Sequence, residues 1–575
     1  MRAASPTFGY GDLDLVELDE QTPLQPARNQ GRSSGSRLLP PLAAAGCACL
    51  MVAAVAYRDA IPRNEGGTTL RGVTTTKKPH IILTVLDDAG YDDLWSSSDL
   101  TSPHLTALRD GGVELTSHYV ASECTPTRGA LLTGMHPTSL GLQRGVISQT
   151  SRWGLDPSAK TLADVLRQEG YTTALAGKWH LGHANDAYLP ERRGFSSVYG
   201  FLGGFVDPYT HYAEAPPVCE SHTEDCVTDW SSPSTTYAAD AVAHEAKRVI
   251  SSTSEKPLFL YFALPTPHEP LSEPPNAVYD DRLQGRRRIF GAIATRQDAK
   301  VGSVVKSLKD NDLWPSTLFI VLADNGAAAA GGSNHPLRGA KGGVWEGGVR
   351  TRALVTGPLI PKNVRGSSYK GLFHASDWMP TILSVAGIPY DEGDGIDQWP
   401  AIKGLAKPPR DEVIIHVDTS SYGMTGAIRR GRWKLLLNVK REPVYDRTSV
   451  SAPLDWLAAE AATFLYDIEA DPSESMDVSA SNTDTVAQLT QRLMDVHAHA
   501  AEPLYCAPTR DEDEKARDAF RANGNKLGPW APLSNDRAHC DDDGEDREAL
   551  LAEACASGRM LASSCARALA AAAAG

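Results

Sequence analysis

Four hydrophobic runs stand out along the chain, and each ends in polar or charged residues. They cover residues 80–86, 171–176, 257–262 and 317–322. Continuous apolar runs of this length are typical of strands that are covered on both faces, as in a parallel sheet flanked by helices. The pattern therefore predicts an α/β fold with a large, mainly parallel sheet.

Hydrophobic residues also recur at helical spacing between the third and fourth runs. They are Ile289, Phe290, Ile293, Val301, Val304, Val305 and Leu308. This spacing predicts a helix that crosses back over the sheet, because two parallel strands need a long crossover connection.

From residue 411 onward the hydrophobic runs become shorter. Strands are expected at residues 412–417, 427–428, 433–437 and 464–467, and a helix at about 485–500. Short successive strands favour an antiparallel sheet. We therefore expect a catalytic domain over residues 78–404 and a smaller C-terminal α+β domain over residues 405–532.

Polar side chains that suit catalysis or metal binding follow each of the four long runs. In chain order they are Asp87 and Asp88, Lys178 and His180, His268, and Asp324 and Asn325. In sheets of this kind, ligands bind beyond the carboxyl ends of the strands. These side chains are therefore expected to meet along one edge of the sheet.

The carboxylates and the amide in this set offer only oxygen ligands. Oxygen ligands suit Ca²⁺ or Mg²⁺, whereas zinc in proteins is usually held by histidine or cysteine. An acidic pair after a strand is often a helix cap, and Asp324-Asn325-Gly326 alone could form a turn. Because the two pairs follow two strands, we interpret all four residues as ligands of a single metal ion.

The segment CTPTRGALLTG, which begins at Cys124, decides the functional interpretation. Pro126 can occupy the first turn of a helix, where its missing N–H does no harm. Cys124 then lies at the helix N-terminus, where free N–H groups and the helix dipole favour an anion. Taken alone, the segment could equally hold a buried structural cysteine beside a turn.

The spacing of Cys124, Pro126 and Arg128 resembles the sulfatase signature, in which the cysteine is oxidised after translation to formylglycine. Other segments carry the same resemblance in the same order; they are residues 177–182, 192–195, 268–271, 323–326, 336–339, 341, 345–350, 376–381 and 466–468. The chain is similar to the sulfatase family, and within it to the arylsulfatase B-like (N-acetylgalactosamine-4-sulfatase-like) group. This resemblance implies the alkaline-phosphatase-like sulfatase fold and a sulfuric ester hydrolase of the arylsulfatase type.

The resemblance also assigns a role to each residue of the expected site. The metal, Ca²⁺ or alternatively Mg²⁺, would be held by Asp87, Asp88, Asp324, Asn325 and one oxygen of the hydrated formylglycine made from Cys124. The formylglycine would be the nucleophile, supported by Arg128 and Lys178, and His180 would orient it and act as its base. The groups that bind the sulfate would be Lys178, His268 and Lys341. The last two of these would also aid departure of the leaving group.

The implied chemistry agrees with these residue types. An aldehyde hydrate carries two hydroxyls on one carbon, so that one can attack sulfur and the other can later expel sulfate. Maturation would need a formylglycine-generating enzyme as a partner, and the substrate would be a sulfated carbohydrate or an aryl sulfate. His335 stands where the arylsulfatase B-like pattern has a tryptophan, and the match is loose over residues 183–237 and 418–460. The group bound beyond the sulfate is therefore left open.

Composition and charge restrict the partners. The chain has 575 residues, of which 41% are hydrophobic and 22% charged, and its formal net charge is −15. This charge argues against a protein that coats nucleic acid, although basic residues near the site can still make a pocket locally positive. Two other functions remain as alternatives: a phosphodiesterase or phosphonate hydrolase with a similar nucleophile, and a sulfated-glycan binding protein on an inactive scaffold.

The segments outside the two expected domains indicate in which cellular compartment the protein resides. Residues 1–37 suggest a disordered, cytosolic tail, and residues 38–57 are uncharged over a length that just reaches a bilayer span. The second segment is either an uncleaved signal anchor, which gives a single-pass type II membrane protein, or a signal peptide of a secreted or lysosomal protein, or a buried helix. Residues 58–77 are expected to be a linker, and residues 533–575 an acidic, Ala-rich tail.

Both leading interpretations place the catalytic body in the secretory pathway, on the lumenal or extracellular side. An oxidising compartment would allow Cys219 and Cys226, which flank a short polar loop, to form a disulfide. The chain has no Asn-x-Ser/Thr sequon, so no N-linked glycan is expected.

Overall fold

The computed structural model describes residues 77–212, 236–443 and 461–533, apart from residues 421–422 and the single positions 96, 98, 329, 507 and 525. The predictions for the N-terminal tail, for residues 38–57, for the Cys219–Cys226 disulfide and for the acidic tail lie outside these residues. Within the described part of the chain, no helix is long and apolar enough to cross a membrane. Both sheets of the fold belong to one compact unit, Thr75–Gly575.

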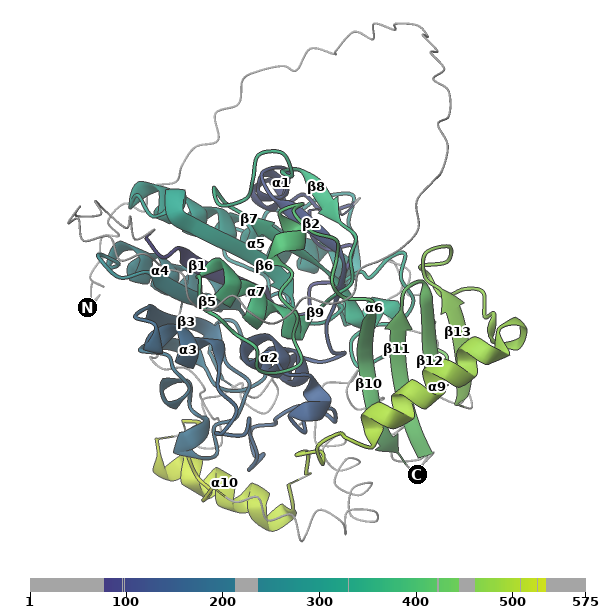
Figure 1. Cartoon of the computed structure of the whole chain (residues 1–575). Coiled ribbons are helices and arrows are strands. Elements are labelled where there is room, and N and C mark those ends of the chain that lie inside the picture. The colour runs from purple at the N-terminus through teal and green to yellow at the C-terminus, as the bar shows by residue number, and fades with distance from the viewer. Residues whose placement is uncertain are drawn as a thin grey trace, which may run out of the picture. The chain divides into compact units, whose positions relative to one another are not determined.

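A sheet of nine strands, counted over the described residues, forms the centre of the fold (Figure 1). Its strands are β1 His80–Leu86, β2 Val113–Tyr119, β3 Thr172–Lys178, β4 Ser197–Phe201, β5 Leu258–Leu264, β6 Thr317–Ala323, β7 Arg350–Thr356, β8 Ser367–Tyr369 and β9 Phe373–His374. Their order is β4-β3-β5-β1-β6-β7-β2-β8, and β9 pairs with β2. Neighbouring strands are parallel, except that β7 runs antiparallel to both β6 and β2. The predicted large, mainly parallel sheet is confirmed.

The four long hydrophobic runs of the sequence form the adjacent strands β3, β5, β1 and β6. β1 has the predicted bounds, whereas β3 and β5 begin one residue later than predicted and end two residues later. Strand pairing continues past the apolar run because the backbone, and not the side chain, makes the ladder of hydrogen bonds. As a result Lys178 is the last residue of its strand.

Both faces of this sheet are covered by helices, which explains why the central strands are apolar at every position. One face packs against α2 Cys124–Thr133, α3 Leu162–Gln168 and α7 Trp378–Val385. The other packs against α1 Pro103–Asp110, α4 Ala238–Ser251 and α5 Gly285–Asp310. Side chains of β1 alternate between the two, with Ile81 on the first face and Ile82 on the second. The long helix α5 is the predicted crossover between β5 and β6.

A second sheet is formed by strands in the C-terminal part of the described residues (Figure 1). Its strands are β10 Glu412–Ser420, β11 Gly423–Arg430, β12 Trp433–Val439 and β13 Ala462–Asp467. Successive strands pair antiparallel, as predicted, and helix α9 Thr483–His497 packs on one face through Leu489 and Leu493. β11 is longer than predicted because its polar ends pair as well. The domain limits 78–404 and 405–532 stay predictions.

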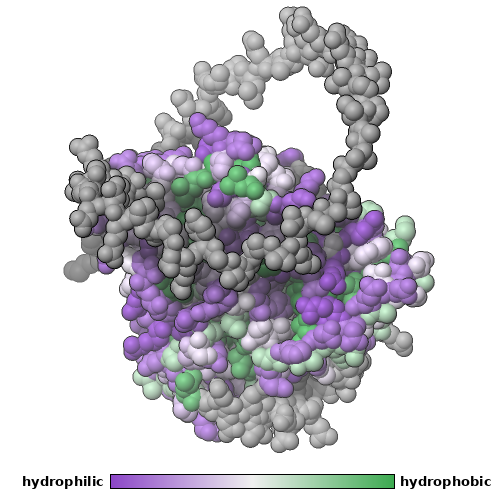
Figure 2. Space-filling model, viewed as in Figure 1, coloured by the Kyte–Doolittle hydropathy of each residue, from purple (hydrophilic) through white to green (hydrophobic). Residues whose placement is uncertain are grey.

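The remaining helical segments are short or peripheral. They are α6 Glu346–Val349, α8 Trp399–Ile402, α10 Arg510–Ala522 and 3₁₀ turns at Pro137–Ser139, Asp186–Tyr188, Pro190–Arg192, Trp314–Ser316, Ala375–Asp377 and Ser479–Ser481. The face of the molecule in Figure 2 is mostly hydrophilic, with small separate hydrophobic patches. A surface of this kind is ordinary for a folded domain in water.

Candidate active site

Strands β1 and β6 bring the predicted metal ligands side by side. Leu86 pairs with Ala323 in the sheet, so the residues that follow both strands are neighbours. The backbone N–H of Asp88 donates to Asp324 Oδ1 at 3.2 Å, and Asn325 Nδ2 donates to Asp88 Oδ1 at 2.7 Å. All four predicted ligands are buried. Asp88 has a φ of 61°, an uncommon conformation for a non-glycine residue, so the turn after β1 depends on these contacts.

Cys124 is the first residue of α2, as the sequence predicts, and Pro126 lies in the first turn. Thr127 Oγ1 accepts a hydrogen bond from the backbone N–H of Ala121 at 3.0 Å, which holds the chain that enters the helix. The thiol is buried, and its Sγ lies 3.6 Å from Asp87 Oδ1. Burial raises the pKa of the Cys124 thiol to about 12, so the thiol keeps its proton at neutral pH.

Two buried cations, Arg128 and Lys178, pair with the carboxylates around the thiol. Lys178 Nζ lies 2.9 Å and 2.8 Å from the two oxygens of Asp87. Arg128 donates from Nε and Nη2 to Asp324 Oδ2, at 3.0 Å and 2.8 Å. Burial raises the pKa of Asp87 to about 7, although the charge of Lys178 opposes this shift. The site is thus a buried network in which each charge needs its partner.

His180 follows β3 and has a φ of 59°. Its Nε2 lies 2.9 Å from the carbonyl oxygen of Ile147, so this nitrogen is the donor, while the buried Nδ1 has no hydrogen-bond partner in the described part of the chain. Burial, followed by the charge of Lys178, holds the pKa of His180 well below its ordinary value. Gly204 must be glycine, because a Cβ there would lie 2.9 Å from His180 Nε2. The result is a neutral imidazole with one nitrogen left to accept a proton.

Two of the predicted sulfate-binding residues, Lys341 and His268, lie near the carboxylate of Asp88. Lys341 Nζ lies 2.7 Å and 2.9 Å from its two oxygens, and His268 Nε2 lies 3.7 Å from Oδ2. His268 Nδ1 lies 2.5 Å from the carbonyl oxygen of Glu269, which leaves Nε2 for the site. The ring of Phe205 lies parallel to the His268 ring, with centroids 5.9 Å apart. Sequence reasoning missed Phe205, since no motif surrounds it.

The residues predicted for the site therefore come together, and their donor atoms fit a divalent cation. Ligand atoms of Asp87, Asp88, Cys124 and His268 lie within 4.8 Å of one another. Asn325 Oδ1 is buried and accepts no hydrogen bond from any described residue. A buried carbonyl oxygen without a partner is costly, and a hard cation would satisfy it.

The loop that carries Lys341 is held from the side of the small sheet. Arg338 donates to the carbonyl oxygens of Glu442 at 2.7 Å and Glu474 at 3.0 Å. The backbone N–H of Ala340 donates to Glu442 Oε2 at 3.3 Å. Residues that are far apart in the chain make these contacts, so the sequence analysis did not find them.

Beneath this loop, Lys434 of β12 is completely buried between two glutamates. Its Nζ lies 3.0 Å from Glu346 Oε1 and 2.8 Å from Glu474 Oε1. Glu346 begins α6, and its backbone N–H donates to Glu474 Oε2 at 2.7 Å. Tyr119, the last residue of β2, donates to Glu346 Oε2 at 2.9 Å. This ion network ties the small sheet to the large one.

Comparisons with a family model, with related sequences and with solved structures all point to the sulfatase family. The model of the sulfatase family matches residues 79–388. Arylsulfatase J of Mus musculus is 32% identical over 502 residues, which cover 81% of this chain and 82% of that protein. Arylsulfatase A of Homo sapiens is 30% identical over 459 residues, which cover 73% of this chain and 87% of that protein. The solved structure of Ps i-CgsB in complex with k-i-k-neocarrahexaose is 27% identical and aligns with a TM-score of 0.64, over 78% of this chain and 99% of that one.

Proposed function

The chain belongs to the sulfatase family and is a sulfuric ester hydrolase, and from this premise we propose that it cleaves sulfate esters of carbohydrates with a formylglycine made from Cys124. The position of Cys124 carries the proposal. It is the first residue of α2, buried beside Asp87, with Arg128 and Lys178 paired to the surrounding carboxylates. A protonated thiol is a poor nucleophile, whereas a formylglycine at this position would be well placed for covalent catalysis.

The proposed role of each residue follows from the hydrogen-bond donors and acceptors that it has available for the substrate. A hydrated formylglycine supplies two hydroxyls on one carbon, one to attack the sulfur and the other to expel sulfate later. His180 would take the proton of the attacking hydroxyl through Nδ1, which has no hydrogen-bond partner among the described residues. Lys178, His268 and Lys341 would bind the sulfate oxygens. Against the effect of burial, Asp88 raises the pKa of Lys341 above its ordinary value, so this ammonium would stay protonated and could donate to the leaving oxygen.

We further propose one Ca²⁺ ion, with Mg²⁺ as the alternative, between Asp87, Asp88, Asp324 and Asn325 and an oxygen of the formylglycine. The carboxylates of Asp87, Asp88 and Asp324 support a hard cation, as does Asn325 Oδ1, which accepts no hydrogen bond from any described residue. Such an ion would stabilise negative charge on the sulfate group. Elemental analysis of the purified protein tests this, and stoichiometric zinc or the absence of any metal would contradict it.

A carbohydrate substrate is supported by the similar structure that holds k-i-k-neocarrahexaose and by the arylsulfatase B-like segments from Lys341 to Arg350 and over residues 376–381. The arylsulfatase B-like subgroup itself stays a prediction. Small aryl sulfates should be cleaved as well, because the bond that breaks is the same. Sulfate release from an aryl sulfate and from a panel of sulfated saccharides is the test. Release from the aryl sulfate alone would refute only the carbohydrate part.

Two measurements test the catalytic mechanism itself. Mass analysis of the Cys124 peptide should show formylglycine when the protein is made together with a formylglycine-generating enzyme. An intact thiol at full occupancy in active protein would refute the proposal. A faster reaction with an aryl phosphate diester than with the aryl sulfate would favour a phosphodiesterase on the same fold.

We also propose that the catalytic body lies on the lumenal or extracellular side of a membrane, anchored through residues 38–57 or released after them. Cys506 is disulfide-bonded, which supports an oxidising compartment. Protease protection of the intact vesicle fraction tests the orientation. Digestion of the catalytic body from the cytosolic side would contradict it.

A further inference from the structure

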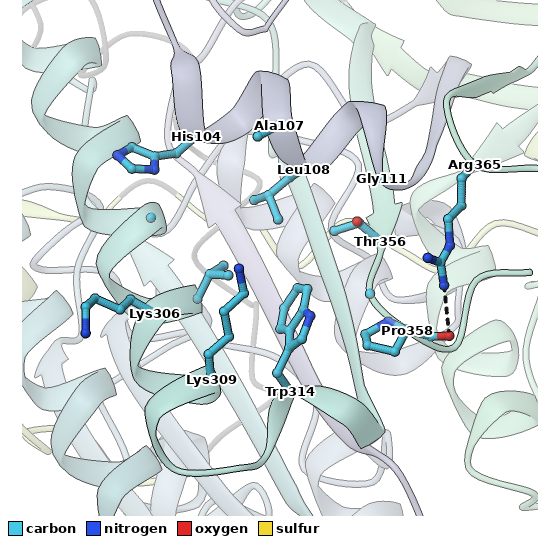
Figure 3. Close-up of a pocket in the computed structure, with 13 residues that line it drawn as sticks. His104, Ala107, Leu108, Gly111, Lys306, Lys309, Trp314, Thr356, Pro358 and Arg365 are labelled. Carbon is cyan, nitrogen blue, oxygen red and sulfur yellow. Dashed lines mark hydrogen bonds between the residues drawn. The ribbon is translucent and has the colours of Figure 1, made fainter. Parts of the chain in front are cut away.

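A pocket outside the catalytic site is lined by residues of α1, of α5 and of the segments before β6 and after β7 (Figure 3). Trp314 in this pocket lies shortly before β6, whereas Asp324 follows the end of β6. The length of the strand, about 20 Å, therefore separates the two sites. The walls of the pocket come from α1, α5, the turn before β6 and the loop after β7, and its volume is about 450 Å³.

The titratable side chains that line this pocket are all of basic residue types. They are His104, Lys306, Lys309 and Arg365, and no Asp or Glu is among the lining residues. Lys306 is compensated by Asp310 at 2.7 Å, and Figure 3 shows its side chain extending away from the indole of Trp314. Among the residues that the structure describes, neither Lys309 nor Arg365 has a carboxylate within ion-pair distance.

Lys309 and Arg365 stand on two sides of a flat apolar surface. Lys309 Nζ lies 5.7 Å from the ring centre of Trp314. On the far wall, Arg365 Nη2 donates to the carbonyl oxygen of Pro358 at 3.2 Å, and Pro358 faces the indole side of the pocket in Figure 3. Arg365 Nε also donates to the carbonyl oxygen of Ile360 at 2.9 Å. The two hydrogen bonds hold the guanidinium in place and leave the N–H groups of Nη1 for a ligand.

The helix dipole explains the position of only one of these two cations, Lys309. Lys309 lies in the last turn of α5, where the helix dipole favours a cation. Arg365 comes from a different element, the segment after β7, and lines the same pocket as Trp314. In a chain with a net charge of −15, two cations that have no carboxylate partner among the described residues and line one pocket with an aromatic ring indicate a site for an anion that also carries a flat apolar face.

We propose that this pocket is a second binding site for an acidic saccharide, with a sugar ring against Trp314 and sulfate or carboxylate groups on Lys309 and Arg365. The choice of a saccharide rests on the proposed carbohydrate substrate. A long sulfated polysaccharide could occupy this pocket and the catalytic site at once. Engagement of both sites would strengthen binding of long chains without changing the chemistry.

Direct binding tests the pocket separately from turnover. The full chain carrying Cys124→Ala is titrated with a chondroitin sulfate decasaccharide, and Lys309→Gln or Arg365→Gln is then added to that background. Each addition should weaken binding roughly five- to tenfold, because a charge-assisted contact is lost. The matched control is Lys403→Gln, since Lys403 Nζ lies 5.1 Å from the ring centre of Trp399, outside the pocket; it should have no effect.

The proposal is overturned if both pocket variants bind the decasaccharide as tightly as their parent. It is also overturned if a poly-glutamate peptide or a single-stranded oligonucleotide binds at the pocket and the decasaccharide does not. Trp314→Leu should weaken binding of the decasaccharide and of its desulfated form alike, because it removes the ring surface. Both exposed cations can be replaced without touching the core, so failure of Trp314→Leu to fold would leave the test intact.

Kinetics separates this proposal from the proposed function. In enzyme with formylglycine, Lys309→Gln should raise KM for a sulfated polysaccharide about fivefold while kcat and KM for an aryl sulfate stay unchanged. Saccharide cleavage with the same KM in wild type and variant would overturn the second site alone. Decasaccharide binding at the pocket without sulfate release from any saccharide would instead refute the carbohydrate substrate and keep the site.

Discussion

Individual side chains of the catalytic site depend on one another because they are buried together. Asp87, Asp324, Arg128 and Lys178 are completely buried, and ion pairs of 2.8 Å join them. In such surroundings the loss of one member leaves its partner charged and unpaired. Cys124 and Asn325 differ from these four because neither belongs to an ion pair, so they can be replaced with less damage to the fold.

Cys124→Ala is expected to fold like the wild type and to lose turnover by a factor of at least about 1,000, because the nucleophile is gone. The thiol belongs to no ion pair among the described residues, and its hydrogen bond to Asp87 is long, at 3.6 Å, so the melting temperature should change little. Thermal unfolding and sulfate release from an aryl sulfate measure the two effects. Turnover close to that of the wild type would show that residue 124 is not the nucleophile.

Asn325→Leu should weaken metal binding at least about tenfold, since it removes a buried oxygen that accepts no hydrogen bond from any residue the structure describes. Asn325→Asp keeps an oxygen at this position and serves as the matched control. Calcium titration followed by thermal shift gives both affinities. Equal stabilisation of the wild type and Asn325→Leu by calcium would rule out Asn325 as a ligand.

At the scale of elements, the small sheet determines where the loop with Lys341 lies. Glu442→Ala removes the acceptor for the Ala340 N–H, and we expect kcat to fall between about 10- and 100-fold through displacement of Lys341. Glu442→Gln retains an oxygen for this hydrogen bond and should keep most of the activity. A purely structural role would instead lower stability in Glu442→Ala and leave kcat unchanged.

The ion network beneath this loop should contribute to stability more than to catalysis. Lys434→Met removes the cation between Glu346 and Glu474 and leaves Arg350 as the ion-pair partner of Glu346, which should lower the free energy of unfolding by about 3–5 kcal/mol. Adding Glu474→Gln to Lys434→Met should recover part of the loss, because one buried charge disappears. Urea unfolding of the two variants checks this, and a double variant less stable than the single one would contradict it.

At the scale of the whole molecule, buried neutral histidines make stability depend on pH. His118 accepts a hydrogen bond from Trp378 Nε1 at 3.0 Å and pairs with Thr351 Oγ1 at 2.9 Å, and burial lowers its pKa from 6.5 to about 3. Burial likewise lowers the pKa of His136 to about 4. Below pH 6.5 the unfolded chain takes up protons at these positions and the native state does not.

The contribution of these two histidines to the free energy of unfolding should therefore fall as the pH drops from 6.5 toward 4, by about 2 kcal/mol for each of them at pH 5. His118→Gln should be less stable at pH 7 but should show a flatter dependence on pH. Urea unfolding at pH 7.5, 6 and 5 measures both slopes. Identical slopes in wild type and variant would exclude His118 as a source.

The sequence by itself determined the central strands, their polar ends and the helix that begins at Cys124. A strand buried on both faces must be apolar at every position, so β1, β3, β5 and β6 could be recognised without their partners. Strands β2 and β7 escaped prediction, because Glu114, His118 and Arg352 interrupt their apolar residues. Their polar groups find partners within the fold; Arg352, for example, donates to Glu114.

Tertiary structure alone decided how the site is held in place. The pairing of Lys178 with Asp87, the stacking of Phe205 on His268 and the attachment of the Lys341 loop to Glu442 join segments that are distant in the chain. Each contact depends on the order of the strands in the sheet and on the path of the loops. Strand order and loop path leave no periodic pattern in the sequence from which the contacts could be predicted. Local hydrophobicity determines which residues form strands, whereas the choice among possible partners for a buried charge is made only when the strands are assembled.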